Sequence, residues 1–452
     1  MKLNVGDKFR LDIRKQGING EGIGYYNKVA VFVPGAIIKE SVNVEIIKSF
    51  NNYAIAKIVD FDRISNRRVE PPCKYYEDCG GCHLQHIDYK EQLKIKQSII
   101  KQSLKRYTNI NPDNIEVSKT IGMKNPYGYR NKSQMPFRNT NFGLVLGFYK
   151  PNSNSFVFVD ECIVHHPKIN EINQEVLRLL RKYHQKAYDL RNKEGILKYL
   201  VVRYLEKTDS ASVIFVVKRF NPILKKISEE LMNDVKSIKS ISYSIDNSSS
   251  NLVVSDQIHM ISGVEKIKEV YDDYKFEISP NAFHQMNTEQ MKKMYDLAIS
   301  AAKTNHNSII FDLYCGIGIT SILLSKDAKK IYGIDYSEAS IKDAVSNMKL
   351  NKVNNIEFIK DHVEGALPKL LNRGIKPDLI ILDPPRTGMS ESVIDAVLKV
   401  LPKQIIYISC NPSTLGKNIN DIASKYVVKS ITPIDMFPQT ASVESITILE
   451  LK

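Results

Sequence analysis

The stretch YISCNPSTL, residues 407–415, places a cysteine where a ligand could reach it. An apolar, strand-like run from Ile405 to Ile408 ends just before Cys410, and Pro412 fixes the backbone of the turn that follows. Ligands bind at the carboxyl ends of strands in open α/β sheets, so a thiol in this position could act as a nucleophile. The alternative is a small buried residue, which is the common fate of a free cysteine.

The stretch FDLYCGIGITS, residues 311–321, has the pattern of a strand, a glycine turn and a helix start. Gly316 and Gly318 would let the backbone approach a ligand above the sheet. Asp335 ends the next strand-like segment, where its carboxylate could accept hydrogen bonds from ribose hydroxyls. Ser321 replaces the third glycine of the dinucleotide fingerprint. The pattern therefore suits S-adenosylmethionine (SAM), which has a ribose and an adenine but no pyrophosphate.

Two further acids follow later strand-like segments. Asp361 comes after IEFIK and could contact the adenine edge, although an ordinary loop or helix-capping acid would look the same. Asp383 lies in LDPPR, residues 382–386, where two prolines hold the carboxylate in a rigid loop at the same edge of the sheet. Such a loop could hold a nucleobase edge or the methyl donor, whereas the alternative is a strand-terminating turn.

Cys410 and Asp383 are expected on neighbouring strands beside SAM, and this combination suits methylation of uracil at carbon 5. That carbon is a weak nucleophile until a thiolate adds to carbon 6, and a base must then remove the carbon 5 proton. The candidate base is Glu444, at the start of the last strand-like segment, although a lone glutamate there would indicate only a polar edge strand. The thiol needs activation by its surroundings, because its ordinary pKa is about 8.5.

Four other cysteines point to a metal site. Cys73, Cys79 and Cys82 are clustered, and Cys162 lies further along the chain. Without an export signal, clustered cysteines indicate metal binding rather than disulfides. Four thiolates suit either a [4Fe–4S] cluster or a zinc ion, and the spacing leaves both open. The remaining Cys315, inside the glycine turn, is expected to be a packed small residue.

The elements that must position these residues change in kind along the chain. Residues 1–59 show short strands and glycine turns, which predict a small OB-like β-barrel of a type that commonly binds RNA or DNA. Residues 60–270 mix strands and helices, which predicts a central α+β domain. Over 271–452 strands alternate with helices, which predicts a parallel, doubly wound, Rossmann-like sheet. The predicted fold class is therefore α/β plus β, in three domains.

The charge of the chain favours a polyanionic partner. It carries 64 Lys and Arg against 50 Asp and Glu, a formal net charge of +14 over 452 residues. We expect nucleic acid before a membrane surface. A basic helix over 88–106 and the stretch GYRNKSQMPFRN, 128–139, are candidate contacts; a merely solvated helix face is the alternative. An apolar signal core and a membrane-spanning run are both missing, so we expect a cytoplasmic monomer with no membrane partner.

The motifs SPNAFHQMN (279–287), DLYCGIG, LDPPR and SCNP resemble, in this order, those of the RNA uracil-5-methyltransferase family, whose bacterial members act on 23S rRNA or on tRNA. The resemblance covers essentially the whole chain, and residues 1–59 are similar to the family's RNA-binding TRAM domain, which implies RNA and not DNA as the partner. It implies that Cys410 is the nucleophile, that Glu444 is the base and that Phe283 stacks near the substrate base. It also implies that SAM contacts Gln285, Tyr314, Asp335 and Asp383.

The four-cysteine set resembles the iron–sulfur site of the rRNA members, which implies a [4Fe–4S] cluster and a 23S rRNA substrate, since the tRNA-specific relatives generally lack the set. At one position the chain departs from the family. Ser442 stands where a histidine often precedes the base by two residues, so a supporting hydrogen bond is in question while the glutamate itself is present. The alternatives are a tRNA uracil methyltransferase, an amino-group methyltransferase, which would need no cysteine, and an iron–sulfur RNA-binding protein without catalysis.

Overall fold

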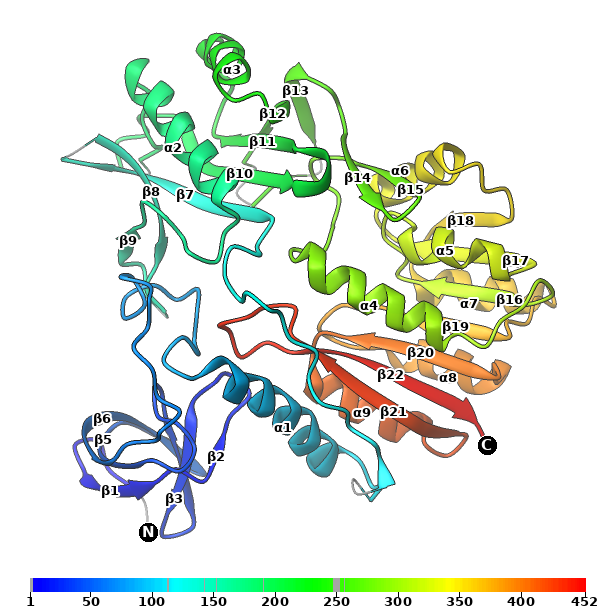
Figure 1. Cartoon of the computed structure of the whole chain (residues 1–452), viewed down its shortest axis with the longest axis horizontal. Helices are drawn as coiled ribbons and strands as arrows, with labels where there is room; N and C mark the ends of the chain where they lie inside the picture. Colours follow the sequence, from blue (N-terminus) through cyan, green and yellow to red (C-terminus); the bar gives the residue numbers. More distant parts are fainter. Residues whose placement is uncertain are drawn as a thin grey trace.

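The computed structural model describes residues 3–111, 114–141, 143–151, 153–189, 191–246, 253–255 and 257–452. Within these residues the chain forms one six-stranded sheet, two seven-stranded sheets and a two-stranded hairpin. In Figure 1 the N-terminal sheet lies at the lower left, the central sheet at the upper left and the C-terminal sheet at the right. Among the described helices, none is long and apolar enough to cross a membrane.

The predicted N-terminal β domain is present as the six-stranded sheet, in the order β1-β5-β6-β4-β3-β2. Its strands alternate between buried and exposed positions, as in SVNVEIIKS of β5, so that Val42, Val44 and Ile46 face a common apolar core. The strands are β1 (Lys8–Asp12), β2 (Lys15–Gln16), β3 (Gly22–Tyr26), β4 (Val29–Val33), β5 (Ser41–Ser49) and β6 (Tyr53–Arg63).

The central sheet is also mixed with helices, as predicted, and its order is β13-β12-β11-β10-β7-β8-β9. The helices α2 and α3 pack against it and share its apolar core. The elements are β7 (Lys132–Thr140), β8 (Gly143–Tyr149), β9 (Phe156–Phe158), α2 (Pro167–Lys182), β10 (Leu197–Leu205), β11 (Ser210–Val217), α3 (Ile223–Asp234), β12 (Ile238–Ile245) and β13 (Ile258–Gly263). A hairpin of β14 (Ile267–Tyr271) and β15 (Tyr274–Ile278) spans the predicted boundary at 270/271 and contacts α6.

The C-terminal sheet has the order β18-β17-β16-β19-β20-β22-β21. Its strands are β16 (Ile309–Leu313), β17 (Lys330–Asp335), β18 (Ile356–Lys360), β19 (Leu379–Leu382), β20 (Gln404–Ser409), β21 (Tyr426–Ile434) and β22 (Glu444–Leu451). Its helices are α4 (Thr288–Ala301), α5 (Ile319–Leu324), α6 (Glu338–Leu350), α7 (Val363–Asn372), α8 (Glu391–Val400) and α9 (Pro412–Ile422). The first five strands are parallel, as predicted, but β22 runs antiparallel to both β20 and β21.

The prediction of a parallel sheet was therefore wrong for β22, which runs against both of its neighbours. A parallel pair requires a crossover connection of a dozen or more residues, usually a helix. The short segment 435–443 between β21 and β22 contains no helix and can only close an antiparallel hairpin. As a result, β22 enters the sheet between β20 and β21, with its first residue at the carboxyl edge of the parallel strands.

The predicted basic helix forms as α1 (Tyr89–Tyr107) and packs against α9 and β21 of the C-terminal sheet. Asp88 caps its N-terminus by accepting a hydrogen bond from the Glu91 N–H at 3.3 Å. Its apolar face, which includes Ile95 and Leu104, is buried in the core of the C-terminal sheet. Although α1 lies within the segment predicted as the central domain, its packing joins it to the C-terminal sheet.

Candidate active site

The predicted catalytic and SAM-contacting residues gather at one edge of the C-terminal sheet. Parallel strands bring their carboxyl ends to a common edge, where ligands of open α/β sheets bind. Tyr314 follows β16, Asp335 ends β17, Asp361 follows β18, Asp383 follows β19 and Cys410 follows β20. Because β22 is antiparallel, its first residue, Glu444, lies at the same edge.

The pairing of β20 with β22 brings Cys410 and Glu444 together. In this antiparallel ladder Ser409 lies across from Ser445. Cys410 directly follows Ser409 and Glu444 directly precedes Ser445, so the two residues lie at adjacent strand ends, and the charge of Glu444 contributes to the raised pKa of Cys410. Two residues separated by a helix, a strand and a loop in the sequence therefore become direct neighbours.

Asn411 fixes the turn that carries Cys410. Its side-chain oxygen accepts the Ser413 N–H at 3.0 Å and so caps α9, which begins at Pro412. Its side-chain nitrogen donates to the backbone carbonyl of Arg386 at 2.9 Å. The SCNP turn is thus tied to the LDPPR loop, and Cys410 lies just before the positive end of a helix.

The two carboxylates nearest Cys410 in this account, Glu444 and Asp383, have raised pKa values. Burial, together with the neighbouring Asp383 charge, raises the pKa of Glu444 to about 8. Burial raises the pKa of Asp383 to about 7, with Asp312 and Asp335 adding to the effect. One carboxylate oxygen of Glu444, Oε2, is buried without a hydrogen-bond partner among the described residues. A buried carboxyl group with a pKa near neutrality and one free oxygen is suited to accept a proton.

The Cys410 thiol is half-buried and has a raised pKa. Burial is the largest cause, followed by the charges of Glu444 and Asp383, and together they bring the pKa to about 11. Arg386 opposes these effects and lowers the pKa values of both Cys410 and Glu444. Arg386 had no predicted role, although its position three residues beyond Asp383, in the same LDPPR loop, was an available signal.

The glycine turn after β16 has the open backbone that was predicted. Tyr314 adopts a left-handed conformation (φ +67°), which is uncommon for a residue with a side chain and is concentrated at functional sites. A Cβ atom on Gly316 would meet nothing within 4 Å, which leaves room for a ligand. By contrast, a Cβ on Gly318 would lie 2.7 Å from the Phe358 ring, so helix and strand packing accounts for this glycine.

The acids around the glycine turn are held by hydrogen bonds. Asp335 accepts the Gly316 N–H at 3.0 Å and the Ser337 N–H at 2.8 Å, and burial raises its pKa. Asp312, the acid of the FDLYCGIGITS stretch that had no predicted role, accepts a 2.6 Å hydrogen bond from Ser321. Burial raises the pKa of Asp312 to about 6. Ser321, which replaces the third glycine, thus ties the start of α5 to Asp312 of β16.

The remaining predicted residues lie in three other segments of the chain. Asp361 is half-buried and accepts an ion-pair hydrogen bond from Lys369 at 2.7 Å, which lowers its pKa. Gln285 is buried in the 279–287 segment, and its carbonyl accepts a hydrogen bond from Asn131 at 3.0 Å. In the same segment Phe283 is 63% exposed, so its ring is free to stack on a ligand. Ser442 lies in the 435–443 segment that leads into Glu444.

The four cysteines of the predicted cluster line a single cavity of about 270 Å³. Cys73, Cys79 and Cys82 come from one segment and Cys162 from another, and none of them forms a disulfide. Burial raises the pKa values of the last three, that of Cys82 to about 12, so these thiols are neutral unless a cation replaces their protons. In the part of the chain that the structure describes, no group of three His, Cys, Asp or Glu side chains could hold a single metal ion.

Two models of known protein families match this chain. The sequence model of the tRNA (uracil-5-)-methyltransferase family matches residues 88–452, and that of the TRAM domain matches residues 2–59. The chain belongs to the tRNA (uracil-5-)-methyltransferase family. The resemblance drawn from the motifs is thereby confirmed, as is the RNA-binding type of the N-terminal domain.

The relatives of this methyltransferase cover its whole length. It is 38% identical to an uncharacterized RNA methyltransferase of Listeria monocytogenes over 449 residues, 99% of this chain and 98% of the relative. A similar protein of Enterococcus faecalis is also 38% identical, over 448 residues. The crystal structure of Pyrococcus abyssi tRNA (uracil-54, C5)-methyltransferase in complex with S-adenosyl-L-homocysteine is similar over 98% of this chain and 100% of that one, with a TM-score of 0.76 and 26% identity.

These comparisons establish a SAM-dependent RNA methyltransferase of the uracil-5 family with a TRAM domain.

The site predicts opposite effects of two neutralising substitutions on the Cys410 thiol. Glu444→Gln removes a negative charge, so the pKa of the thiol should fall; Arg386→Gln removes a positive charge, so it should rise. Glu444 is ionised where the thiol titrates, because its own pKa of about 8 is lower than about 11. The rate of alkylation of the Cys410 peptide, followed by mass spectrometry over a pH series, measures both shifts. Shifts in the same direction would contradict the described neighbourhood, and Glu450→Gln, at the far end of β22, should leave the profile unchanged.

Proposed function

We propose that this methyltransferase forms 5-methyluridine in 23S rRNA through a covalent bond between Cys410 and carbon 6 of uracil. One observation carries the proposal: the β20–β22 pairing brings Cys410 and Glu444 to adjacent strand ends, and the buried Oε2 atom of Glu444 has no partner among the described residues. A thiol and a proton-accepting carboxylate side by side are what carbon 5 methylation of uracil requires. An amino-group methyltransferase would need neither group.

Each step of the proposed reaction is carried out by a named group. The Cys410 thiolate adds to carbon 6 of uracil, and the electrons of the carbon 5–carbon 6 double bond become available at carbon 5. SAM supplies the methyl group, which carbon 5 takes up. Glu444 accepts the carbon 5 proton, the double bond re-forms, and Cys410 leaves as a thiolate.

The pKa values set a consistent pH dependence. Glu444 must be ionised to accept the proton. Because its pKa is raised to about 8, proton removal should slow as the pH falls below about 8. Cys410 must also be ionised, so activity should rise with pH through this range. The α9 N-terminus and Arg386 both favour the thiolate.

The residues at the sheet edge suit the parts of SAM. We propose that Asp335 contacts the ribose and Asp361 the adenine edge, at the ends of β17 and β18. Gly316 and Tyr314 would border the centre of SAM, and Gln285 and Asp383 would lie toward the methyl group, near Cys410. The sheet order supports this arrangement, because β17 and β18 lie on the side of β16 away from β20. We do not retain Gly318 as a SAM contact, because packing against Phe358 accounts for it.

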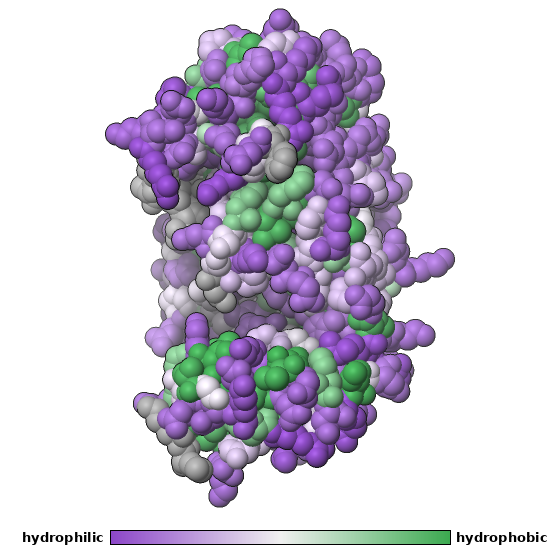
Figure 2. Space-filling view, turned by 90° about the vertical axis from the view of Figure 1, so that its left-hand side faces the viewer, coloured by the Kyte–Doolittle hydropathy of each residue, from purple (hydrophilic) through white to green (hydrophobic). Residues whose placement is uncertain are grey.

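RNA would be held by the N-terminal domain together with the exposed lysines of α1, Lys94, Lys101 and Lys105. Figure 2 shows a mostly hydrophilic face with separate hydrophobic patches, some of them low in the view, where the N-terminal sheet lies. Exposed apolar side chains of this domain include Ile47, Phe50 and Phe61. Phe50 and Tyr53 stack with ring centroids 4.4 Å apart, and Arg68 lies over the Phe61 ring. Exposed aromatic rings beside cations are suited to stacking on nucleobases.

The cavity lined by Cys73, Cys79, Cys82 and Cys162 fits a [4Fe–4S] cluster better than zinc. A zinc ion draws four sulfurs to about 2.3 Å from one point, whereas a cluster is held by thiolates around a larger space. The cavity of about 270 Å³ that all four cysteines line leaves room for the larger occupant. These four residues would hold the cluster. The proposed methyl transfer does not use the chemistry of the cluster.

Protein purified without oxygen should therefore contain iron and acid-labile sulfide rather than zinc. Cys82→Ser should lose most of the iron and give less folded protein, because a cluster stabilises the fold that its ligands close. Cys410→Ser should keep its iron, since Cys410 lies outside the cavity. Metal analysis of the three proteins decides the question, and stoichiometric zinc without iron in the unsubstituted protein would refute the cluster.

The choice of RNA rests on two observations that point in different directions. The four-cysteine cavity favours 23S rRNA, because the cysteine set resembles that of the rRNA members. The second candidate, a tRNA uracil-5-methyltransferase, is favoured by the similarity to an enzyme that acts on uracil-54 of tRNA. Mapping 5-methyluridine by mass spectrometry in RNA from cells with and without the gene separates the two. Loss from 23S rRNA supports the proposal, whereas loss from tRNA alone supports the second candidate.

A further inference from the structure

The segment 435–443, here called the base loop, connects β21 to β22 and leads directly into Glu444. At the base of this loop Ile434 of β21 lies across from Glu444. Asp435, one residue beyond Ile434, is therefore close to Glu444 along the backbone. Any shift of the base loop is transmitted to the first residue of β22, and hence to the proposed base.

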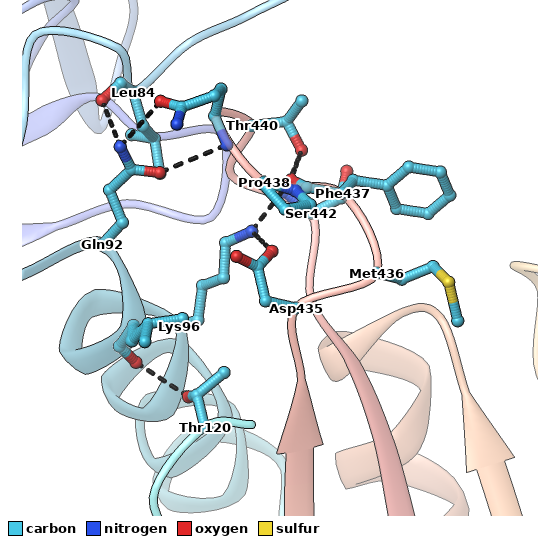
Figure 3. Close-up of polar contacts among 12 residues, drawn as sticks. Leu84, Gln92, Lys96, Thr120, Asp435, Met436, Phe437, Pro438, Thr440 and Ser442 are labelled. Carbon is cyan, nitrogen blue, oxygen red and sulfur yellow. Dashed lines mark hydrogen bonds and ion pairs between the residues drawn. The ribbon is translucent and has the colours of Figure 1, made fainter. Parts of the chain in front are cut away.

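Two fully buried charges meet under this loop. Lys96 of α1 forms an ion pair with Asp435, and both side chains are 0% exposed. Lys96 also donates to the carbonyl of Phe437 at 3.0 Å, and the Tyr89 hydroxyl donates to Asp435 at 2.8 Å. Figure 3 shows the lysine reaching from the helix to the carboxylate and the loop backbone.

Burying an ion pair costs free energy, because both charged groups lose their hydrating water. Apolar residues of similar volume often stabilise a fold as well, so such a pair is better explained by a need to fix one arrangement of the chain. The other buried positions of the α1 face include apolar residues such as Ile99 and Ile100. Lys96 therefore places a charge beside these apolar residues, directly against the start of the base loop.

A second contact from α1 holds the middle of the loop. Gln92, one turn before Lys96, donates to the side-chain oxygen of Gln439 at 2.9 Å and accepts the Gln439 N–H at 3.2 Å. The Gln439 carbonyl accepts hydrogen bonds from the N–H groups of His83 and Leu84, at 2.9 and 3.0 Å. Gln439 has φ +69°, a left-handed conformation that persists in a residue with a side chain only when its surroundings impose it.

Other segments close the loop from its remaining sides. Asn287, at the N-terminus of α4, donates to the Met436 carbonyl at 3.1 Å, and Tyr129 donates to the Pro438 carbonyl at 3.0 Å. In the N-terminal domain, a side chain at Gly20 would collide with Leu84 and approach Ala441. Parts of all three predicted domains thus meet at the loop that carries the proposed base.

We propose that Lys96 is a positioning residue for the methyl-transfer site: through Asp435 and Phe437 it holds the base loop so that Glu444 faces the carbon 5 proton. The inference rests on the proposed role of Glu444 as the base. Lys96 touches neither RNA nor SAM in this account. Its effect is confined to the step in which Glu444 removes the proton, after the methyl group has been transferred.

The test compares Lys96→Met with the double variant Lys96→Met/Asp435→Asn, which leaves no unpaired buried charge. In single turnover with RNA and labelled SAM, both should transfer the methyl group but release the product about 10–100-fold more slowly, as expected for a misplaced catalytic group. The methylated protein–RNA adduct should then accumulate on a denaturing gel. Lys198→Met, which breaks the half-buried Lys198–Asp246 pair of the central domain, is the matched control and should show no adduct.

A merely structural role for Lys96 would lower the fraction of active protein and reduce transfer and release together, without adduct. That result in the double variant would overturn the inference, even if Lys96→Met alone failed to fold. Glu444→Gln is measured beside them. If it traps the adduct and the Lys96 variants do not, only the positioning role fails; if it traps none, the proposed function of Glu444 fails as well.

Discussion

Replacing Cys410 by alanine should abolish methylation while leaving RNA and SAM binding nearly intact. Without the thiolate, carbon 5 of uracil is never activated, so no methyl group can be accepted. Removing a covalent nucleophile lowers turnover by on the order of 10⁴–10⁶-fold. The measurement is incorporation of a labelled methyl group into RNA under single-turnover conditions, with binding followed separately by calorimetry.

The matched variant for this experiment is Cys410→Ser, which keeps the size of the side chain and its place before α9. A serine hydroxyl is far less nucleophilic, so this variant should be as inactive as the alanine variant. Neither variant should form an adduct that survives denaturation. Methylation near the original rate in Cys410→Ala would show that the thiol is a packed residue, the alternative that the sequence left open.

Replacing Glu444 by glutamine should give a different defect, because this residue acts after Cys410. The thiolate can still add to carbon 6 and the methyl group can still be transferred, but the carbon 5 proton then has no acceptor. Loss of a general base slows its step about 10²–10⁴-fold. Elimination stalls, and a methylated protein–RNA adduct should remain on a denaturing gel.

The adduct should appear in Glu444→Gln and be missing in the double variant Cys410→Ala/Glu444→Gln. Glu450→Gln is the matched control, because Glu450 lies in the same strand and is ion-paired with Lys303 away from the site. It should turn over normally. Normal turnover by Glu444→Gln, or an adduct in a protein that lacks Cys410, would show that the two roles are wrongly assigned.

Most of the site residues at the carboxyl edge of the C-terminal sheet could be predicted from the sequence, because short motifs determine the local backbone conformation. A strand followed by glycines, or by Asp-Pro-Pro, or by Cys-Asn-Pro, has few structural solutions, and each put its residue at the carboxyl end of a strand as expected. Asn411 shows why: its side chain caps α9 and bonds to the LDPPR loop, so local chemistry and position are linked.

What could not be predicted depends on contacts between segments far apart in the chain. The antiparallel entry of β22 was missed, since strand–helix alternation carries no sign of the final hairpin, yet this pairing is what brings Glu444 to the strand end beside Cys410. Lys96 looked like one of several lysines on a basic helix. Its neighbour in space, Asp435, is 339 residues away in the sequence, so no local pattern marked it as buried.

The most direct test of the account is to follow a labelled methyl group from SAM to RNA. The purified protein would be incubated with 23S rRNA and tRNA from cells that lack the gene, together with SAM that carries a trideuterated methyl group. Mass spectrometry of the digested nucleosides should find the label as 5-methyluridine from 23S rRNA, and Cys410→Ala should give none. Label on adenine, or unchanged 5-methyluridine formation by Cys410→Ala, would contradict the central claim.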